Sequence, residues 1–157
     1  MPNIVYNVFW KNILEGNIAW DDDTVIRALL FTTDSTYTPS RTHQTIQQIK
    51  EAGLVEVSSD TGYRRATISD KVVGTVEVGG EPYPALLGGP ALFGAIESGI
   101  TIKGALLFVR VGLTDQDSVD YPAVYIDTAT GLPKETNGGV VVWSPGSSGY
   151  IRLMPCQ

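Results

Sequence analysis

The densest group of side chains able to bind a metal ion is Asp21-Asp22-Asp23, which directly precedes an apolar stretch. Clustered carboxylate oxygens are the ligands that Ca²⁺ and Mg²⁺ prefer. However, the spacing does not follow an EF-hand loop, and neighbouring residues of a strand point to opposite faces. We therefore interpret the three aspartates as the solvated start of a strand, and we expect no metal site and no cofactor.

The only histidine, His43, is the residue that any nucleophile–histidine–acid triad in this chain would need. It lies in a polar stretch at the expected start of a helix, where we expect it to be exposed to solvent. Ser147 and Ser148 belong to a Pro-Gly-Ser-Ser-Gly turn, which is not the G-x-S-x-G nucleophile elbow. The glycine-rich stretch 88–94 lacks the Lys-Ser/Thr pair of a phosphate-binding loop. We expect a non-enzymatic protein, and a small hydrolase using His43 is kept as an alternative.

The composition and net charge of the chain limit the classes of molecule that it can bind. The chain has 157 residues and a net charge of −6, with basic residues scattered except for the adjacent pair Arg64-Arg65. Binding to nucleic acid needs clustered Lys and Arg, so we expect no nucleic-acid partner. Because Cys156 is the single cysteine, no intrachain disulfide can form, and we assign no role to this residue. Residues 2–14 have neither the basic region of a signal peptide nor the length of a membrane span, so we expect a soluble protein folded in a reducing compartment.

The elements that would position these residues are mostly strands. Three stretches have the apolar, β-branched character of central strands, 24–31, 101–111 and 122–127, and the second of them is expected to bulge at Gly104. Shorter strands are expected at 54–57, 63–68, 72–73, 75–78, 140–143 and 150–153, with the last two forming a hairpin and 63–68 lying at a sheet edge. The chain is rich in Gly and Pro, which suits many short strands and turns.

Two helices are expected. Apolar residues recur every three or four positions over 3–16, which predicts an amphipathic N-terminal helix capped by Asn3 and ended by Gly16. A second, short helix is expected over 44–52, capped by Thr42, with Ile46 and Ile49 facing inward. The stretch 84–99 is interpreted as an inward-packed loop with one turn of helix. The fold prediction is a single mainly β domain over 1–157, a β-sandwich or jelly-roll with an N-terminal helix and one short additional helix.

Several short stretches, in this order, resemble a family of small virion structural proteins of tailed bacteriophages. They cover most of the chain between residues 3 and 153, and only the stretch 79–99 departs from the family pattern. The stretches are Ile4-Val5-Tyr6-Asn7, Asp23-Thr24 before Ala28-Leu29-Leu30, Ser35-Thr36-Tyr37-Thr38-Pro39 with His43, Gly62-Tyr63, Ala123-Val124-Tyr125-Ile126-Asp127, Gly138-Gly139, Trp143 and Ile151-Arg152-Leu153.

The resemblance implies a protein that decorates or cements the capsid shell. Its partners would be the major capsid protein and copies of itself, as a dimer or trimer, and it would be located in the virion after synthesis in the bacterial cytoplasm. A tail, neck or host-binding virion protein is the alternative. We expect most aromatic residues to be core, with Trp10 and Tyr37 as exceptions. The residues predicted to contact a partner are Val5, Val8, Phe9, Trp10, Tyr37, Thr38 and Pro39.

Overall fold

The three strands with the strongest sequence signal lie side by side at the centre of one antiparallel sheet. The computed structural model describes residues 3–146 and 149–153. In it, β7 (Thr101–Val109) pairs with β2 (Ile26–Thr32) on one side and with β8 (Tyr121–Ile126) on the other. Short strands continue the sheet, β1 (Ile4–Val5) beside β8 and β3 (Ala66–Thr67) beside β2, while β9 (Lys134–Glu135) pairs with the start of β7.

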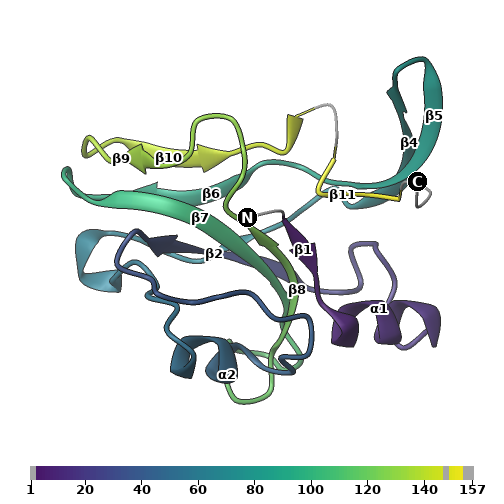
Figure 1. The fold of residues 1–157 in the computed structure, drawn as a ribbon, viewed down its shortest axis with the longest axis horizontal. Coiled ribbons are helices and arrows are strands. Elements are labelled where there is room, and N and C mark those ends of the chain that lie inside the picture. The colour runs from purple at the N-terminus through teal and green to yellow at the C-terminus, as the bar shows by residue number, and fades with distance from the viewer. Residues whose placement is uncertain (1–2, 147–148, 154–157) are drawn as a thin grey trace.

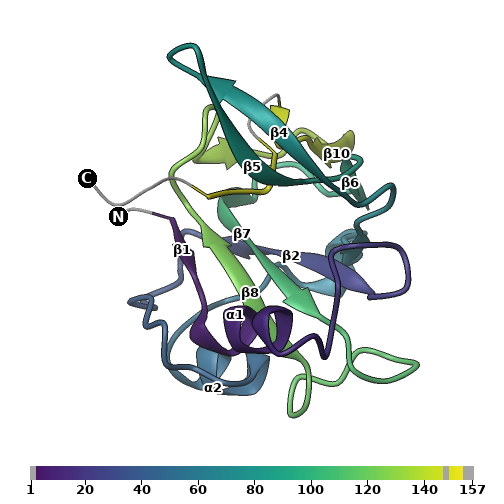
Figure 2. The same cartoon turned by 90° about the vertical axis from the view of Figure 1, so that its right-hand side faces the viewer.

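A second layer of strands covers one face of this sheet. It contains a three-stranded sheet of β4 (Val72–Val78), β5 (Glu81–Leu87) and β11 (Ile151–Arg152) and a pair formed by β6 (Ala91–Ala95) and β10 (Val140–Trp143). The helices α1 (Asn7–Leu14) and α2 (Ile46–Glu51) lie on the opposite side, as Figures 1 and 2 both show. A single turn of 3-10 helix spans Ser59–Thr61. The fold is mainly β and sandwich-like, with two helices in the described residues, which confirms the predicted fold class.

Burial on both faces explains why the central strands could be recognised from sequence. On β2, Ile26, Ala28 and their neighbours are buried from solvent, because the second layer covers one face of the strand and the helices cover the other. The predicted irregularity near Gly104 is present, because Phe31 pairs with Gly104 whereas Thr32 pairs with Ile102. A side chain at Gly104 would overlap the Phe31 ring and the carbonyl oxygen of Ile126, so only glycine fits there.

The N-terminal helix is shorter than predicted. Ile4 and Val5 form β1 and pair with Tyr125 and Val124, so the helix begins at Asn7 rather than at residue 3. The Asn3 side chain does not cap the helix, because its oxygen accepts hydrogen bonds from the Asp127 and Thr128 backbone N–H groups. Strand pairing therefore overrides the helical spacing of the first residues, whereas Gly16, at φ +73°, follows the helix end as expected.

The remaining corrections concern the second helix and the second layer. The α2 helix is capped by Thr45, whose hydroxyl accepts from the Gln48 N–H, and not by Thr42. Ile46 and Ile49 are fully buried, as predicted. The stretch 84–99 is not a loop, because most of it belongs to β5 and β6. The predicted final hairpin is also wrong, since β10 pairs with β6 and β11 pairs with β5.

Candidate functional site

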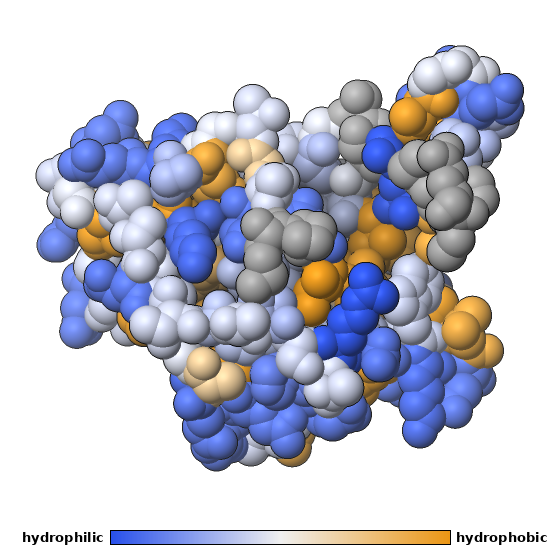
Figure 3. Space-filling view, in the orientation of Figure 1, coloured by the Kyte–Doolittle hydropathy of each residue, from blue (hydrophilic) through white to orange (hydrophobic). Residues whose placement is uncertain are grey.

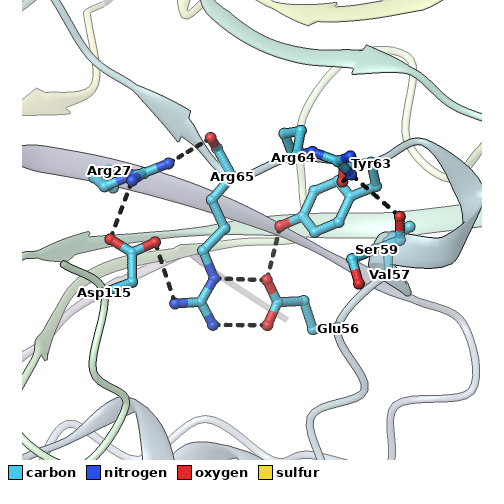
Figure 4. A pocket seen from close by; sticks show the side chains of 8 residues that line it. All are labelled: Arg27, Glu56, Val57, Ser59, Tyr63, Arg64, Arg65 and Asp115. Carbon is cyan, nitrogen blue, oxygen red and sulfur yellow. Dashed lines mark hydrogen bonds and ion pairs between the residues drawn. The ribbon is translucent and has the colours of Figure 1, made fainter.

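The polar residues that could do chemistry gather in a charged cluster beside β3. Figure 4 shows much of it around a pocket of about 440 Å³ lined by Arg27, Glu56, Arg65 and Asp115 among others. Six charged side chains make up the cluster, and they come from β2, α2, the segment before the 3-10 helix, the residue preceding β3 and the β7–β8 loop. They are Arg27, Lys50, Glu56, Arg65, Asp115 and Asp117.

Arg65 is the centre of the charged cluster. Its guanidinium binds both oxygens of Glu56, Nε to Oε1 at 2.7 Å and Nη2 to Oε2 at 2.8 Å. It also donates to Asp117 Oδ1 at 2.9 Å and lies 5.1 Å from the centre of the Phe108 ring. Lys50 Nζ joins the two acids from the other side, 2.6 Å from Glu56 and 2.7 Å from Asp117. The stretch 63–68 was expected at a sheet edge, and within it β3 is the terminal strand beside β2. The half-buried Arg65 side chain, next to β3, belongs to an ion network.

The pKa shifts follow from this geometry. Burial alone would raise the pKa of the Glu56 carboxyl, but the hydrogen bonds and charges of Arg65 and Lys50 outweigh burial and hold that pKa below its ordinary value. The pKa of Asp117 is lowered in the same way, against the effect of burial, by Lys50 and Arg65. Burial would lower the pKa of Arg65, yet Glu56 and Asp117 raise it. The acids are therefore ionised and paired, a state suited to fastening segments together rather than to accepting a proton.

His43 takes part in a different polar contact. Its Nδ1 lies 2.9 Å from the Tyr37 hydroxyl, which is also 2.9 Å from the Tyr6 hydroxyl and accepts from the Ser40 N–H. Burial raises the pKa of Tyr6, and of Tyr37 too, so both phenols stay neutral. The His43 ring is half-buried rather than exposed, and across residues 3–146 and 149–153 it makes no contact with a serine hydroxyl or a carboxylate. Ser147, Ser148 and Cys156 lie outside the described residues.

Two of the three aspartates have partners within the protein. Asp21 Oδ1 accepts from the N–H groups of Asp23 and Thr24, and Asp22 Oδ1 lies 3.4 Å from the ammonium group of Lys71. Within the described residues, no group of three or more His, Cys, Asp or Glu is placed to hold a metal ion.

The seven predicted contact residues fall into two classes. Phe9 and Tyr37 are core residues, 0% and 3% exposed, so the prediction that they contact a partner is corrected. Phe9 faces inward from α1 because Ile4 and Tyr6 fix the preceding segment against β8. Tyr37 is held in the core by its hydroxyl contacts with Tyr6 and His43. The others keep some exposure, and their role as contacts stays a prediction: Val5, Val8, Trp10 and Pro39 are half-buried and Thr38 is exposed.

A group of exposed apolar residues that sequence reasoning missed lies in the second layer. On β6 and β10, Leu92 and Val142 are directly paired and more than half exposed, as is Val140 two residues away. These three residues are called the β6–β10 outer face below. Ala91 and Phe93, the neighbours of Leu92 in sequence, are fully buried, so β6 alternates between core and surface. This alternation was the available signal, and the glycines and proline around it obscured it.

The hairpin of β4 and β5, called the arm below, is the second missed feature. It pairs without interruption from Val72 and Leu87 to Val78 and Glu81, and Gly79-Gly80 forms the turn with φ values of +61° and +86°. Figures 1 and 2 show the arm projecting beyond both layers, and Figure 3 shows its tip standing clear of the body. On β4, Val72 and Val73 are 53% and 60% exposed. The arm therefore carries apolar side chains that its own chain does not cover.

No protein-family model, curated protein or solved structure matches this chain. No helix in the described part of the chain is both long enough and apolar enough to cross a membrane.

Proposed function

We propose that this chain is a non-enzymatic structural protein of a tailed-phage virion that decorates or cements the capsid shell. The observation that carries the proposal is the apolar surface of the second layer, formed by the β6–β10 outer face and the arm. Exposed apolar patches rimmed by polar residues mark surfaces that other proteins cover. The resemblance of the sequence to small phage virion proteins supports the choice of a capsid as the partner.

The β6–β10 outer face is the proposed contact with the major capsid protein. Leu92 and Val142 are adjacent across the strand pair, so they can be covered together by one apolar element of a partner. The charged cluster supports this division of roles, because its acidic and basic side chains form ion pairs with one another. The patch itself is small. Weak contacts of this kind become effective when many copies bind neighbouring sites on one shell.

The experiment measures how many copies the particle carries. Purified particles of the phage that encodes this chain are expected to contain it in proportion to the major capsid protein, at hundreds of copies. A handful of copies per particle would contradict the capsid assignment and favour the tail, neck or host-binding alternative.

A double substitution then tests whether the β6–β10 outer face contacts the shell. Leu92→Ser combined with Val142→Ser is expected to reduce occupancy of shells lacking the protein. The matched control, Leu113→Ser combined with Val111→Ser, changes apolar residues of the β7–β8 loop that are at least as exposed, and it is expected to bind as the unmodified chain does. Equal occupancy by both variants would contradict the role of the β6–β10 outer face.

A further inference from the structure

The outer edge of β4 pairs with no other strand of the described residues. In the sheet order β11-β5-β4, β4 is the terminal strand, and over the described residues its backbone makes hydrogen bonds only with β5. It is seven residues long, whereas the other terminal strand of that sheet, β11, has only two. A long open edge presents a row of N–H and C=O groups that another strand can bind.

The direction of these groups follows from the bonds on the other side of β5. The Pro84 and Leu86 carbonyl oxygens accept from the Leu153 and Tyr150 N–H groups, so they point away from β4. In an antiparallel pair, residues alternate between those that bond across the pair and those that face away from it. The residues opposite Pro82, Pro84 and Leu86 must therefore turn their N–H and C=O groups outward. These residues are Glu77, Thr75 and Val73.

Most proteins protect such an edge, and β4 lacks the usual devices. Lysine, proline, a bulge or a covering loop commonly prevents edge-to-edge pairing. The β4–β5 register is regular, and residues 72–78 include neither lysine nor proline. The prolines of the arm, Pro82 and Pro84, lie on β5 at positions whose backbone faces away from β4. The chain therefore leaves the edge of β4 open and blocks the edge of β5.

We propose that a second copy of this chain binds this edge, with the two β4 strands antiparallel about a two-fold axis through Thr75. In this register Thr75 faces Thr75 of the second copy, and Val73 faces Glu77 of the second copy. All three outward-facing residues of each strand then pair with outward-facing residues of the other, which satisfies six N–H and six C=O groups. The result is a continuous six-stranded sheet built from two three-stranded ones.

The side chains of β4 suit a second copy in this register. Val72 falls opposite Val78, and Gly74 opposite Val76, so apolar residues meet at the closely spaced pairs. The only charged residue, Glu77, falls opposite Val73 rather than opposite another Glu77. Threonine facing threonine is a favourable pair in antiparallel sheets. Chains with a net charge of −6 can associate through this edge because it brings no two carboxylates face to face.

This inference deepens the proposed function, in which many copies bind neighbouring sites on one shell, by assigning a contact between copies to β4. The first test is the mass in solution of the unmodified chain and of Thr75→Pro. The unmodified chain is expected to form a dimer in a concentration-dependent manner, and Thr75→Pro to stay monomeric, because proline removes an outward N–H group that no group among residues 3–146 and 149–153 accepts. Circular dichroism and thermal unfolding check that the variant is folded. An unmodified chain that is monomeric up to about 1 mM overturns the proposal.

A charge pair tests the register without proline. Val73→Lys places an ammonium group opposite Glu77 of the second copy, whereas Val73→Glu places a carboxylate there, and the two-fold axis repeats each contact. The Val73→Glu dimer is expected to dissociate at least about tenfold more readily than the Val73→Lys dimer, with the difference reduced by salt. Equal dissociation constants for the two variants would overturn the register.

The two proposals can fail separately. A monomeric chain that still fills the shell contradicts the β4 interface and leaves the capsid role standing. If the chain dimerises through β4 but is absent from the particle, the capsid role is contradicted and the β4 interface stands.

Discussion

Replacing Glu56 by glutamine tests whether the charged cluster fastens the fold together. The Glu56 side chain is 14% exposed and contacts Arg65 twice, Lys50 once and the Tyr63 hydroxyl once. Glutamine keeps the shape and one acceptor oxygen but removes the charge. Among the described residues, Asp115 and Asp117 are then the anionic partners that remain for Arg65 and Lys50.

The magnitude follows from burial. Removing one member of a buried ion pair costs about 3–5 kcal/mol, because the remaining charge is left without compensation. Here Asp117 and Lys50 are each close to one-third exposed and retain contact with water. Arg65 also keeps two other carboxylates. We therefore expect Glu56→Gln to lower the free energy of unfolding by about 2–3 kcal/mol at neutral pH.

Urea denaturation followed by tryptophan fluorescence measures this change, since Trp20 is buried in the core. The matched control is Glu51→Gln on the exposed surface of α2, where the Glu51 side chain accepts only from Gln47, and we expect a change within about 0.5 kcal/mol. The reasoning is refuted if Glu56→Gln is as stable as the unmodified chain, or if Glu51→Gln costs as much.

The pH dependence of the free energy of unfolding is a second test of the role of Glu56. The pKa of Glu56 is lowered from its ordinary value of 4.5 in the folded state, so the unfolded chain binds the proton more readily. The stabilisation is therefore complete above about pH 4.5 and is lost as the pH falls through the lower, folded pKa. The difference in unfolding free energy between the unmodified chain and Glu56→Gln should be constant from pH 5 to 8 and shrink below pH 4.5. A difference that stays the same in acid would show that charge is not its cause.

Three further predictions concern the interior. Gly104→Ala should destabilise the fold by at least about 3 kcal/mol in urea denaturation, because a side chain there overlaps the neighbouring strand. Gly112→Ala, where a Cβ would make only an ordinary van der Waals contact, should change the stability by less than about 0.5 kcal/mol. Tyr37→Phe should cost about 1–3 kcal/mol, since it leaves a buried Tyr6 hydroxyl without its hydrogen-bond partner, and the His43 ring resonances in NMR spectra should shift. Phe9→Ala should cost about 3–5 kcal/mol, while truncation of the exposed Leu14 on the same helix should be nearly neutral by thermal unfolding.

The central strands could be predicted because their signal is local. β2, β7 and β8 are buried on both faces, so nearly every residue is apolar and the stretch is recognisable without knowledge of its neighbours. The signal of the short helix α2 is also local, because it consists of the inward-facing Ile46 and Ile49 and of Gly53, which follows the helix. These elements form the centre of the sheet and one of the two helices that cover it.

In the second layer, β4, β10 and β11 were expected near their observed positions, whereas β5, β6 and the pairing of β10 and β11 were not predicted. Pro82 and Pro84 argue against a strand unless it is known that their missing N–H groups face away from β4. Similarly, Ile4 and Val5 belong to the helical pattern of apolar residues over 3–16. They form a strand because they pair with β8, more than a hundred residues later in the sequence. The charged cluster has no sequence signature at all, because Arg27 and Asp117 are brought together by the fold alone.

The charged cluster also changes how the net charge of the protein should be understood. Its three basic and three acidic residues compensate one another inside the fold, which leaves 8 basic against 14 acidic residues for the rest of the chain. The whole excess of −6 therefore lies outside the cluster, and two copies repel each other at a distance. An interface built from backbone groups and valines, as on β4, is one that such copies can form, and screening the repulsion should strengthen it. Association of the unmodified chain should therefore increase as salt is raised from low to physiological concentration, whereas an interface made of ion pairs would weaken.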